Sequence, residues 1–155
     1  MPEETKTVAT NRKAQHDFFL EDRFEAGIAL LGSEIKSIRA GQVSLRESYV
    51  QVRQGEVWLI GAHIAPYNPA SMMNHQPTRD RKLLLTRREI GKLESHVQER
   101  GYTIVPTKLY ITARGLAKLE IALARGKRQY DKRRDIAKRE AQREIDRTLA
   151  RRQRR

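Results

Sequence analysis

Residues 48–64 read SYVQVRQGEVWLIGAHI, and the fold prediction starts from them. Val50 and Val52 alternate with polar residues, which is typical of a strand with one buried face. Gln54–Gly55 forms a two-residue turn, and residues 57–64 form the returning strand. This segment is therefore predicted to be a β-hairpin.

Short apolar segments on either side of the hairpin supply further strands, near residues 17–20, at 24–32, 83–85 and 102–112. Gly27 indicates a bulge or a close backbone approach, and Pro106 indicates a sheet edge or a bulge.

Residues 116–126 fit two structures. Leu119, Ile121 and Leu123 alternate as in a strand, whereas Leu116, Leu119 and Leu123 also share a helical face. Their residues alone leave strand and helix about equally supported.

Two helices are predicted. One begins at Thr86, where Thr86 and Glu89 form a capping box, and ends at Gly101. A short one has Ser33 as N-cap and presents Lys36 and Arg39 outward. Residues 1–10 are expected to be a loose arm and residues 66–77 a mobile loop. Six strand candidates without βαβ alternation predict a mainly β fold, a small antiparallel barrel.

The last thirty residues, 126–155, hold thirteen Lys or Arg and five Asp or Glu, so they carry +8 of the chain's +13. They contain too little apolar surface to offset about 1–2 kcal/mol of backbone entropy per ordered residue. Arg139, Arg143 and Arg147 belong to an i, i+4 ridge that a polyanion would neutralise. We expect this tail to be disordered when free and helical on RNA; a tail that only aids solubility is the alternative.

Composition narrows the function classes. A charge of +13 on 155 residues points to nucleic acid, and the tail lacks the apolar face that a membrane-surface helix needs. The chain has no cysteine and no apolar run of membrane-spanning length, so a cytoplasmic protein is expected.

The sequence predicts no catalytic site, metal or cofactor. His16, His63, His75 and His96 have no partner at i+3 or i+4, and no phosphate loop or nucleophile elbow is present. We expect His63 to be a satisfied structural residue and His75 to lie in a loop. Metal-dependent nuclease chemistry is disfavoured for the same reasons.

Basic clusters beside aromatic residues indicate RNA binding when they are taken together, although each alone is more typical of a solvated surface. They are Asn11, Arg12 and Lys13 before Phe18 and Phe19; Lys36 with Arg39; Arg79, Arg81 and Lys82; and Lys108 with Tyr110. A structural ribosomal protein with a basic tail is the competing interpretation.

Three blocks carry a family resemblance: NRKAQHDFFLEDRFEAGIALLGSEIKSIRAGQ (11–42), PTRDRKLLLTRREI (77–90) and GKRQYDKRRDI (126–136). They resemble the SsrA-binding protein family (small protein B), the partner of bacterial transfer-messenger RNA. The resemblance implies an OB-type six-stranded antiparallel barrel with about three flanking helices, and a strand at 116–125. It divides the chain into an arm (1–10), an RNA-binding barrel (11–125) and a tail (126–155).

The resemblance also implies a function. A monomeric, non-catalytic adaptor would bind the tRNA-like part of transfer-messenger RNA and deliver it, with elongation factor Tu and GTP, to stalled ribosomes. The tail would occupy the decoding centre and the empty mRNA channel. Alanyl-tRNA synthetase would be a partner only through the RNA.

The residues carried over for RNA binding are Asn11, Glu25 and Leu85, with His16, Lys36, Arg39, Arg79, Arg81 and Lys82 in the surrounding surface and Arg12 and Lys13 from the first basic cluster. Glu25 could instead form a structural salt bridge, and Leu85 could belong to the core. The expected ribosome-binding tail residues are Lys127, Arg128, Tyr130, Asp131, Lys132, Arg133, Arg139, Arg143 and Arg147. Tyr130 stands where members commonly have His; it keeps a ring for stacking but cannot become cationic near neutral pH.

Overall fold

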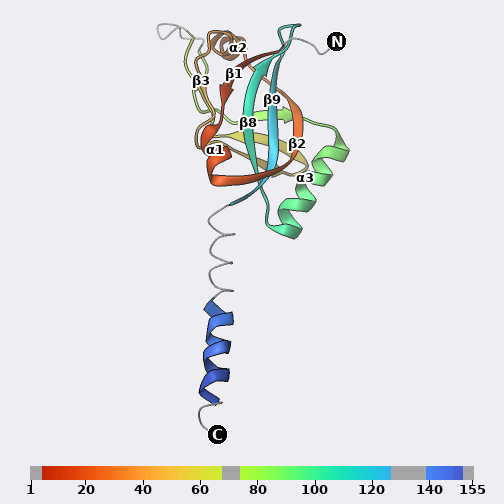
Figure 1. The fold of residues 1–155 in the computed structure, drawn as a ribbon. Coiled ribbons are helices and arrows are strands. Elements are labelled where there is room, and N and C mark those ends of the chain that lie inside the picture. The colour runs from red at the N-terminus through yellow and green to blue at the C-terminus, as the bar shows by residue number, and fades with distance from the viewer. Residues whose placement is uncertain (1–4, 68–73, 127–138, 152–155) are drawn as a thin grey trace.

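The structure is a computed structural model, and it describes residues 5–67, 74–126 and 139–151 (Figure 1). Six antiparallel strands form a closed ring in the order β8-β4-β5-β7-β2-β9, because β8 also pairs with β9. The ring is uneven, since β4 and β8 are joined only at Val50 and Ile104. The predicted mainly β antiparallel fold is confirmed. The ring strands are β2 (Phe18–Ile28), β4 (Tyr49–Arg53), β5 (Glu56–Ile60), β7 (Arg81–Leu84), β8 (Thr103–Ile111) and β9 (Ala117–Gly126).

The interior of the ring holds the core. Val57, Leu59 and Ile121 are at most 1% exposed, and two helices close the core from outside the ring. Ile38 comes from α2 (Gly32–Arg39) and Leu93 from α3 (Arg87–Arg100). Burial of these apolar side chains is the main stabilising contribution to the barrel.

The central hairpin forms as predicted. Val52 pairs with Val57 and Arg53 with Glu56, and Gln54 and Gly55 both have positive φ, as a tight hairpin turn requires. The returning strand is shorter than predicted, however. It ends at Ile60, and β6 (His63–Ile64) pairs instead with β3 (Val43–Ser44) in a separate two-stranded sheet.

The longer helix confirms its prediction. Thr86 Oγ1 accepts from the Glu89 amide at 3.3 Å, the Glu89 carboxylate accepts from the Thr86 amide at 3.1 Å, and Gly101 ends the helix with φ 69°. The N-cap of α2 is Leu31 rather than Ser33, because the Glu34 carboxylate accepts from the Leu31 amide at 2.8 Å.

The N-terminal segment differs from its prediction. Residues 6–10 are strand β1 (Lys6–Thr10), which pairs antiparallel with β8, so the expected loose arm is wrong for these residues. A helix that was not predicted, α1 (Arg12–Asp17), follows directly. Pairing with a strand about a hundred residues away stabilises β1, and no local pattern reveals such pairing.

The ambiguous segment 117–126 is strand β9, paired on both sides with β2 and β8. Pro106 marks a bulge, because the β8–β9 register shifts between Pro106 and Lys108, although β8 lies inside the sheet and not at its edge. Gly27 marks a close approach: a Cβ there would lie 3.3 Å from the Leu84 Cβ.

Residues 139–151 form a helix in which every residue is exposed, and Figure 1 shows it apart from the barrel. The expectation of a wholly disordered free tail is therefore corrected for this segment. Helix-favouring residues and local contacts account for the helix, among them Gln142 Nε2 to Asp146 Oδ1 at 3.2 Å. Among the described residues, no helix has the length and apolar character to cross a membrane.

Candidate nucleic-acid interface

Helix α2 places two expected RNA-binding cations at the surface. Lys36 and Arg39 are both exposed. Lys36 Nζ lies 5.5 Å from the centroid of the Tyr67 ring, and Arg39 Nη2 donates to the Gly115 carbonyl at 3.4 Å. These contacts orient both side chains without neutralising either charge, so both remain available to phosphate.

Helix α1 presents a second cationic group. Arg12 and Lys13 are exposed, and Lys13 pairs with Glu47 at 3.2 Å. The His16 side chain is 87% exposed, and its Nδ1 lies 2.9 Å from an Asp17 carboxylate oxygen.

Asn11 is buried, whereas a residue that contacts RNA directly would be exposed. It is only 4% exposed, its Oδ1 accepts from the Ala14 amide at 3.1 Å, and its Nδ2 donates to the Pro106 carbonyl at 2.9 Å. Asn11 therefore caps α1 and ties it to β8, so it positions Arg12 and Lys13 while being itself covered.

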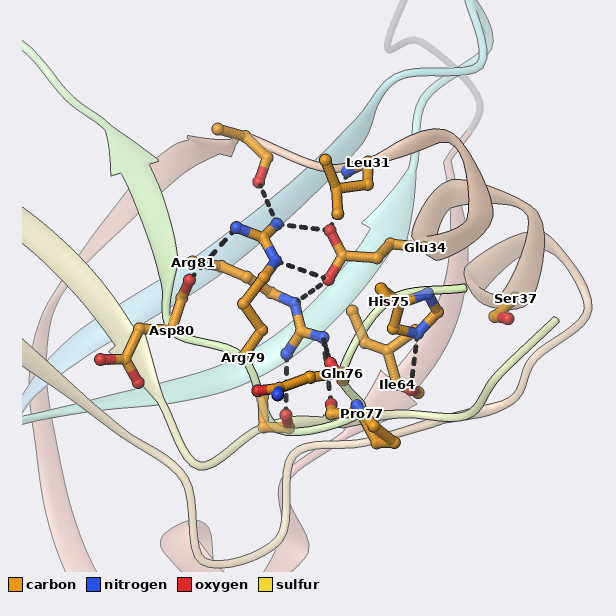
Figure 2. Close-up of polar contacts among 12 residues, drawn as sticks. Leu31, Glu34, Ser37, Ile64, His75, Gln76, Pro77, Arg79, Asp80 and Arg81 are labelled. Carbon is orange, nitrogen blue, oxygen red and sulfur yellow. Dashed lines mark hydrogen bonds and ion pairs between the residues drawn. The ribbon is translucent and has the colours of Figure 1, made fainter. Parts of the chain in front are cut away.

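The third cationic group consists of Arg79, Arg81 and Lys82. Arg81 is buried, and the other two side chains reach the surface. Arg81 has no exposed surface: its Nε lies 2.6 Å from Glu34 Oε2, and its Nη1 donates to the Ala62 carbonyl at 2.8 Å (Figure 2). The assignment of Arg81 to an RNA-contacting surface is therefore wrong for this structure. Arg79 is about one-third exposed and pairs with the other Glu34 oxygen at 2.5 Å. Lys82 lies outside and pairs with Glu56 at 3.3 Å.

Glu34 is the buried carboxylate that joins this network, and the sequence reading did not single it out. Burial alone would raise the pKa of Glu34, but hydrogen bonds from Arg79, Leu31 and Arg81 outweigh it and hold the pKa below its ordinary value. The pKa of Arg81 is lowered, chiefly by burial, against the opposing effect of Glu34. Glu34 thus anchors α2 to β7 as an ionised group.

His75 lies outside the helices and strands, as expected, but it is the histidine with two structural contacts, a role that was predicted for His63. His75 is 6% exposed, its Nε2 lies 2.8 Å from the Ile64 carbonyl, and its Nδ1 lies 2.8 Å from Ser33 Oγ. Because a carbonyl only accepts, Nε2 carries a proton and donates to Ile64, while Nδ1 shares a hydrogen bond with the Ser33 hydroxyl. His63, expected to be the satisfied structural residue, is exposed.

Glu25 lies on the outer face of the barrel, across β2, β9 and β8. The Tyr110 hydroxyl donates to Glu25 Oε2, and Lys118 Nζ lies 3.9 Å from Oε1. Burial, followed by the contact with Glu25, raises the pKa of Tyr110 well above its ordinary value, so the phenol stays a donor. Leu85 is half-buried and packs against the core.

The tail residues are only partly within the described residues. Arg139, Arg143 and Arg147 are exposed on the helix of residues 139–151. The other expected tail residues lie outside the described residues; these are Lys127, Arg128, Tyr130, Asp131, Lys132 and Arg133.

The described residues contain no group of three or more metal-ligating side chains close enough to hold an ion. The geometry assembled here consists of separate cationic groups on the outside of a rigid barrel, with an exposed basic helix beyond it. Such an arrangement suits contacts with phosphates spread over a large folded RNA.

The chain is similar to known proteins along nearly its whole length. The family model described as "SmpB protein" matches residues 8–151. An SsrA-binding protein of Roseiflexus sp. (strain RS-1) is 60% identical over 151 residues, covering 97% of this chain and 95% of the relative. An SsrA-binding protein of Rubrobacter xylanophilus is 60% identical over 147 residues, covering 95% of this chain and 97% of that one.

One solved structure gives the same picture in three dimensions. A chain described under "tmRNA-SmpB: a journey to the center of the bacterial ribosome" superposes with a TM-score of 0.65 at 46% identity. The similarity covers 76% of this chain and 82% of the other.

Proposed function

This chain belongs to the SmpB family of SsrA-binding proteins, and from that premise we propose that it is a non-catalytic adaptor that binds transfer-messenger RNA and brings it to stalled ribosomes. The observation that carries the proposal is the extent of the family match. It runs from residue 8, within β1, through the whole ring to residue 151 at the end of the tail helix.

The barrel supplies the RNA-binding part of this function. Arg12 and Lys13 on α1, and Lys36 and Arg39 on α2, are exposed cations on short rigid elements. Asn11 and the Glu34 network hold those elements in place, so the cations reach phosphates without first being ordered. Exposed Lys82 and partly exposed Arg79 extend the surface.

The tail supplies the ribosome-binding part. Arg139, Arg143 and Arg147 recur at i, i+4 along an exposed helix and would lie against ribosomal RNA in the empty mRNA channel. Lys127, Arg128 and the Asp131–Arg133 element would meet the decoding centre, where Tyr130 would stack on a base. Elongation factor Tu with GTP and alanyl-tRNA synthetase would act through the RNA, in the cytoplasm.

Co-purification from the native cell tests this function. The protein is isolated with an affinity tag, and the RNA that accompanies it is sequenced, before and after a high-salt wash of the ribosomes. We expect transfer-messenger RNA to be enriched and the protein to be substoichiometric to ribosomes. A structural ribosomal protein would remain on the washed subunits at one copy each, with no enrichment of that RNA.

A further inference from the structure

A hollow of about 320 Å³ lies where the ring is least complete, between β4, the start of β8 and helix α3. β4 and β8 pair only at Val50 and Ile104, and α3 packs beside both strands from outside the ring (Figure 1). The hollow is lined by four consecutive residues of β4, 49–52, and by residues 102–104. It therefore follows the edge of β4 past the point at which its pairing with β8 ends.

The edge of β4 at this hollow has backbone groups left for a further strand. The Gln54–Gly55 turn makes Arg53 and Glu56 a hydrogen-bonded pair. Because hydrogen bonding alternates along an antiparallel strand, Val50 and Val52 direct their N–H and C=O groups away from β5. Val50 is paired with β8 on that side, whereas Val52 has no strand partner there in the described part of the chain. Such an edge can accept an extended segment of another chain through main-chain hydrogen bonds.

The walls of the hollow suit an apolar side chain. Tyr49 and Val97 line it and are 45% and 37% exposed. The Tyr102 ring also lines it and is held in place, because the Arg125 guanidinium lies 5.8 Å from its centroid and the His96 ring lies 5.7 Å away. Alternate side chains of a strand point to opposite faces, so every second residue of an added strand would face these walls.

The charge of the hollow does not suit RNA. Within residues 5–67, 74–126 and 139–151, no Lys or Arg lines it, although the chain as a whole carries +13. Its one charged side chain is Glu94, which accepts from Gln98 Nε2 at 3.3 Å. A lysine of the same helix, Lys92, pairs instead with Asp22 at 3.1 Å. Glu94 repels phosphate and favours a Lys or Arg side chain, so the occupant that fits is a peptide with a basic residue.

We propose that this hollow binds an extended basic segment of a partner protein, which adds to β4 as a strand at Val52. One apolar side chain of the segment lies against Tyr49 and Val97, and a neighbouring Lys or Arg pairs with Glu94. The proposal adds a protein partner to an RNA-binding chain. It does not rest on the proposed function, and the binding of transfer-messenger RNA stands whatever the result here.

Synthetic peptides test the proposal on the full-length protein. The first probe is a peptide of about six residues, the length of an ordinary strand, that alternates Val and Thr around one Lys. A second probe has Glu in place of the Lys, and a third is the Lys probe with every backbone amide N-methylated. We expect the Lys probe to shift the amide NMR signals of Val52, Val97 and Tyr102 saturably. The N-methylated probe should not shift them, because it cannot pair as a strand.

The sign of the charge separates recognition from the overall field of the protein. A chain of +13 attracts the Glu probe without specificity, whereas the hollow prefers the Lys probe. Glu94→Lys should reverse that preference and weaken binding of the Lys probe about two- to five-fold. The matched control is Glu99→Lys, an exposed residue of the same helix outside the lining. It should leave the order of the two probes unchanged.

Three further results would overturn the proposal. The first is that the Lys probe gives no saturable shift at Val52, or that the N-methylated probe binds equally well. The second is that an oligouridylate RNA shifts the same three amides, which would make the hollow a nucleic-acid site. The third concerns the tail: the chain has no cysteine, so Ala150→Cys carries a single spin label. Broadening of the Val52 and Val97 signals by that label in the free protein would make the tail the occupant.

Discussion

Arg81 and Glu34 lie in the core with no exposed side-chain surface, and both are charged. Removing two ions from water is unfavourable, and only complete hydrogen bonding offsets the penalty. Here the Arg81 guanidinium also donates to the carbonyls of Ala62 and Pro77, and Glu34 also accepts from Arg79 and Leu31. The network holds α2, β7 and the end of the 74–80 segment together as one polar junction.

Arg81→Met should destabilise the protein strongly, because the buried Glu34 carboxylate loses its only fully buried cationic partner and keeps Arg79, which is partly exposed, and the Leu31 amide. Loss of one member of a buried pair costs about 3–5 kcal/mol. Arg79→Met is the matched control, since Arg79 is partly exposed and its loss leaves the Arg81 contact intact. Urea unfolding measures both. Equal effects of the two substitutions would contradict the assignment of Arg81 as the principal partner.

Glu34 also gives stability a defined pH dependence. Its folded-state pKa lies below the ordinary value of 4.5, so its contribution is fully present above that value and is lost as pH falls through the folded pKa. The free energy of unfolding should therefore decline as the pH falls below about 4.5. Glu34→Gln should be less stable near neutral pH and should lose less stability on acidification. Parallel pH profiles for the two proteins would contradict this role.

Structural elements that depend on neighbouring residues could be predicted from the sequence. The Thr86–Glu89 capping box and the Gln54–Gly55 turn were predicted, because each depends on neighbouring residues, whereas at Pro106 the bulge was one of two alternatives and the sheet edge was the other. Strand β1 was not predicted, since pairing with β8 makes it a strand.

In the candidate interface, too, features with a local cause could be predicted and features that depend on distant residues could not. Exposed Lys36 and Arg39 follow from the helical spacing in α2, whereas the burial of Arg81 could not be predicted. A run such as RDRK gives no indication that its second arginine meets a carboxylate from a helix forty-seven residues earlier. For α1, Asn11 is a residue type that favours the N-cap, so the sequence does hold a local signal for this helix.

The tail helix is the element whose stability depends least on the rest of the protein. Residues 139–151 bury no side chain, and isolated helices shorter than about 12–15 residues are marginal in water. We expect a peptide of residues 126–155 to be weakly helical by circular dichroism and to gain helicity when ribosomal RNA is added. Ala141→Gly should lower helicity by an amount equivalent to about 1 kcal/mol. A spectrum that RNA leaves unchanged would contradict a tail that folds on its partner.

At the scale of the whole molecule, two dissimilar parts share one chain. The ring is rigid because six strands close on each other around an apolar core, and its cations are carried on elements fixed by buried polar contacts. The tail helix is exposed on all sides. A closed barrel suits recognition of a shaped RNA, and a basic helix that is exposed along residues 139–151 suits a narrow channel.

Binding of the barrel to transfer-messenger RNA should depend steeply on salt. Each phosphate neutralised changes the log–log slope by roughly 0.7 to 0.9. Lys36→Gln should reduce the slope by about one phosphate's share, whereas Glu56→Gln, which removes no cation, should leave the slope as it is. Affinity titrations across a range of salt concentrations measure it. An unchanged slope for Lys36→Gln would exclude Lys36 from phosphate contact.

The central claim is that the barrel holds the RNA while the tail engages the ribosome. Truncation after Gly126 tests it directly, because β9 ends there and its last pair, Gly126 with Phe18, is retained. Affinity for transfer-messenger RNA and tagging of incomplete proteins on stalled ribosomes are measured for the truncated and full-length chains. We predict nearly unchanged affinity and complete loss of tagging. Equal loss of both, or tagging that survives the truncation, would contradict the account.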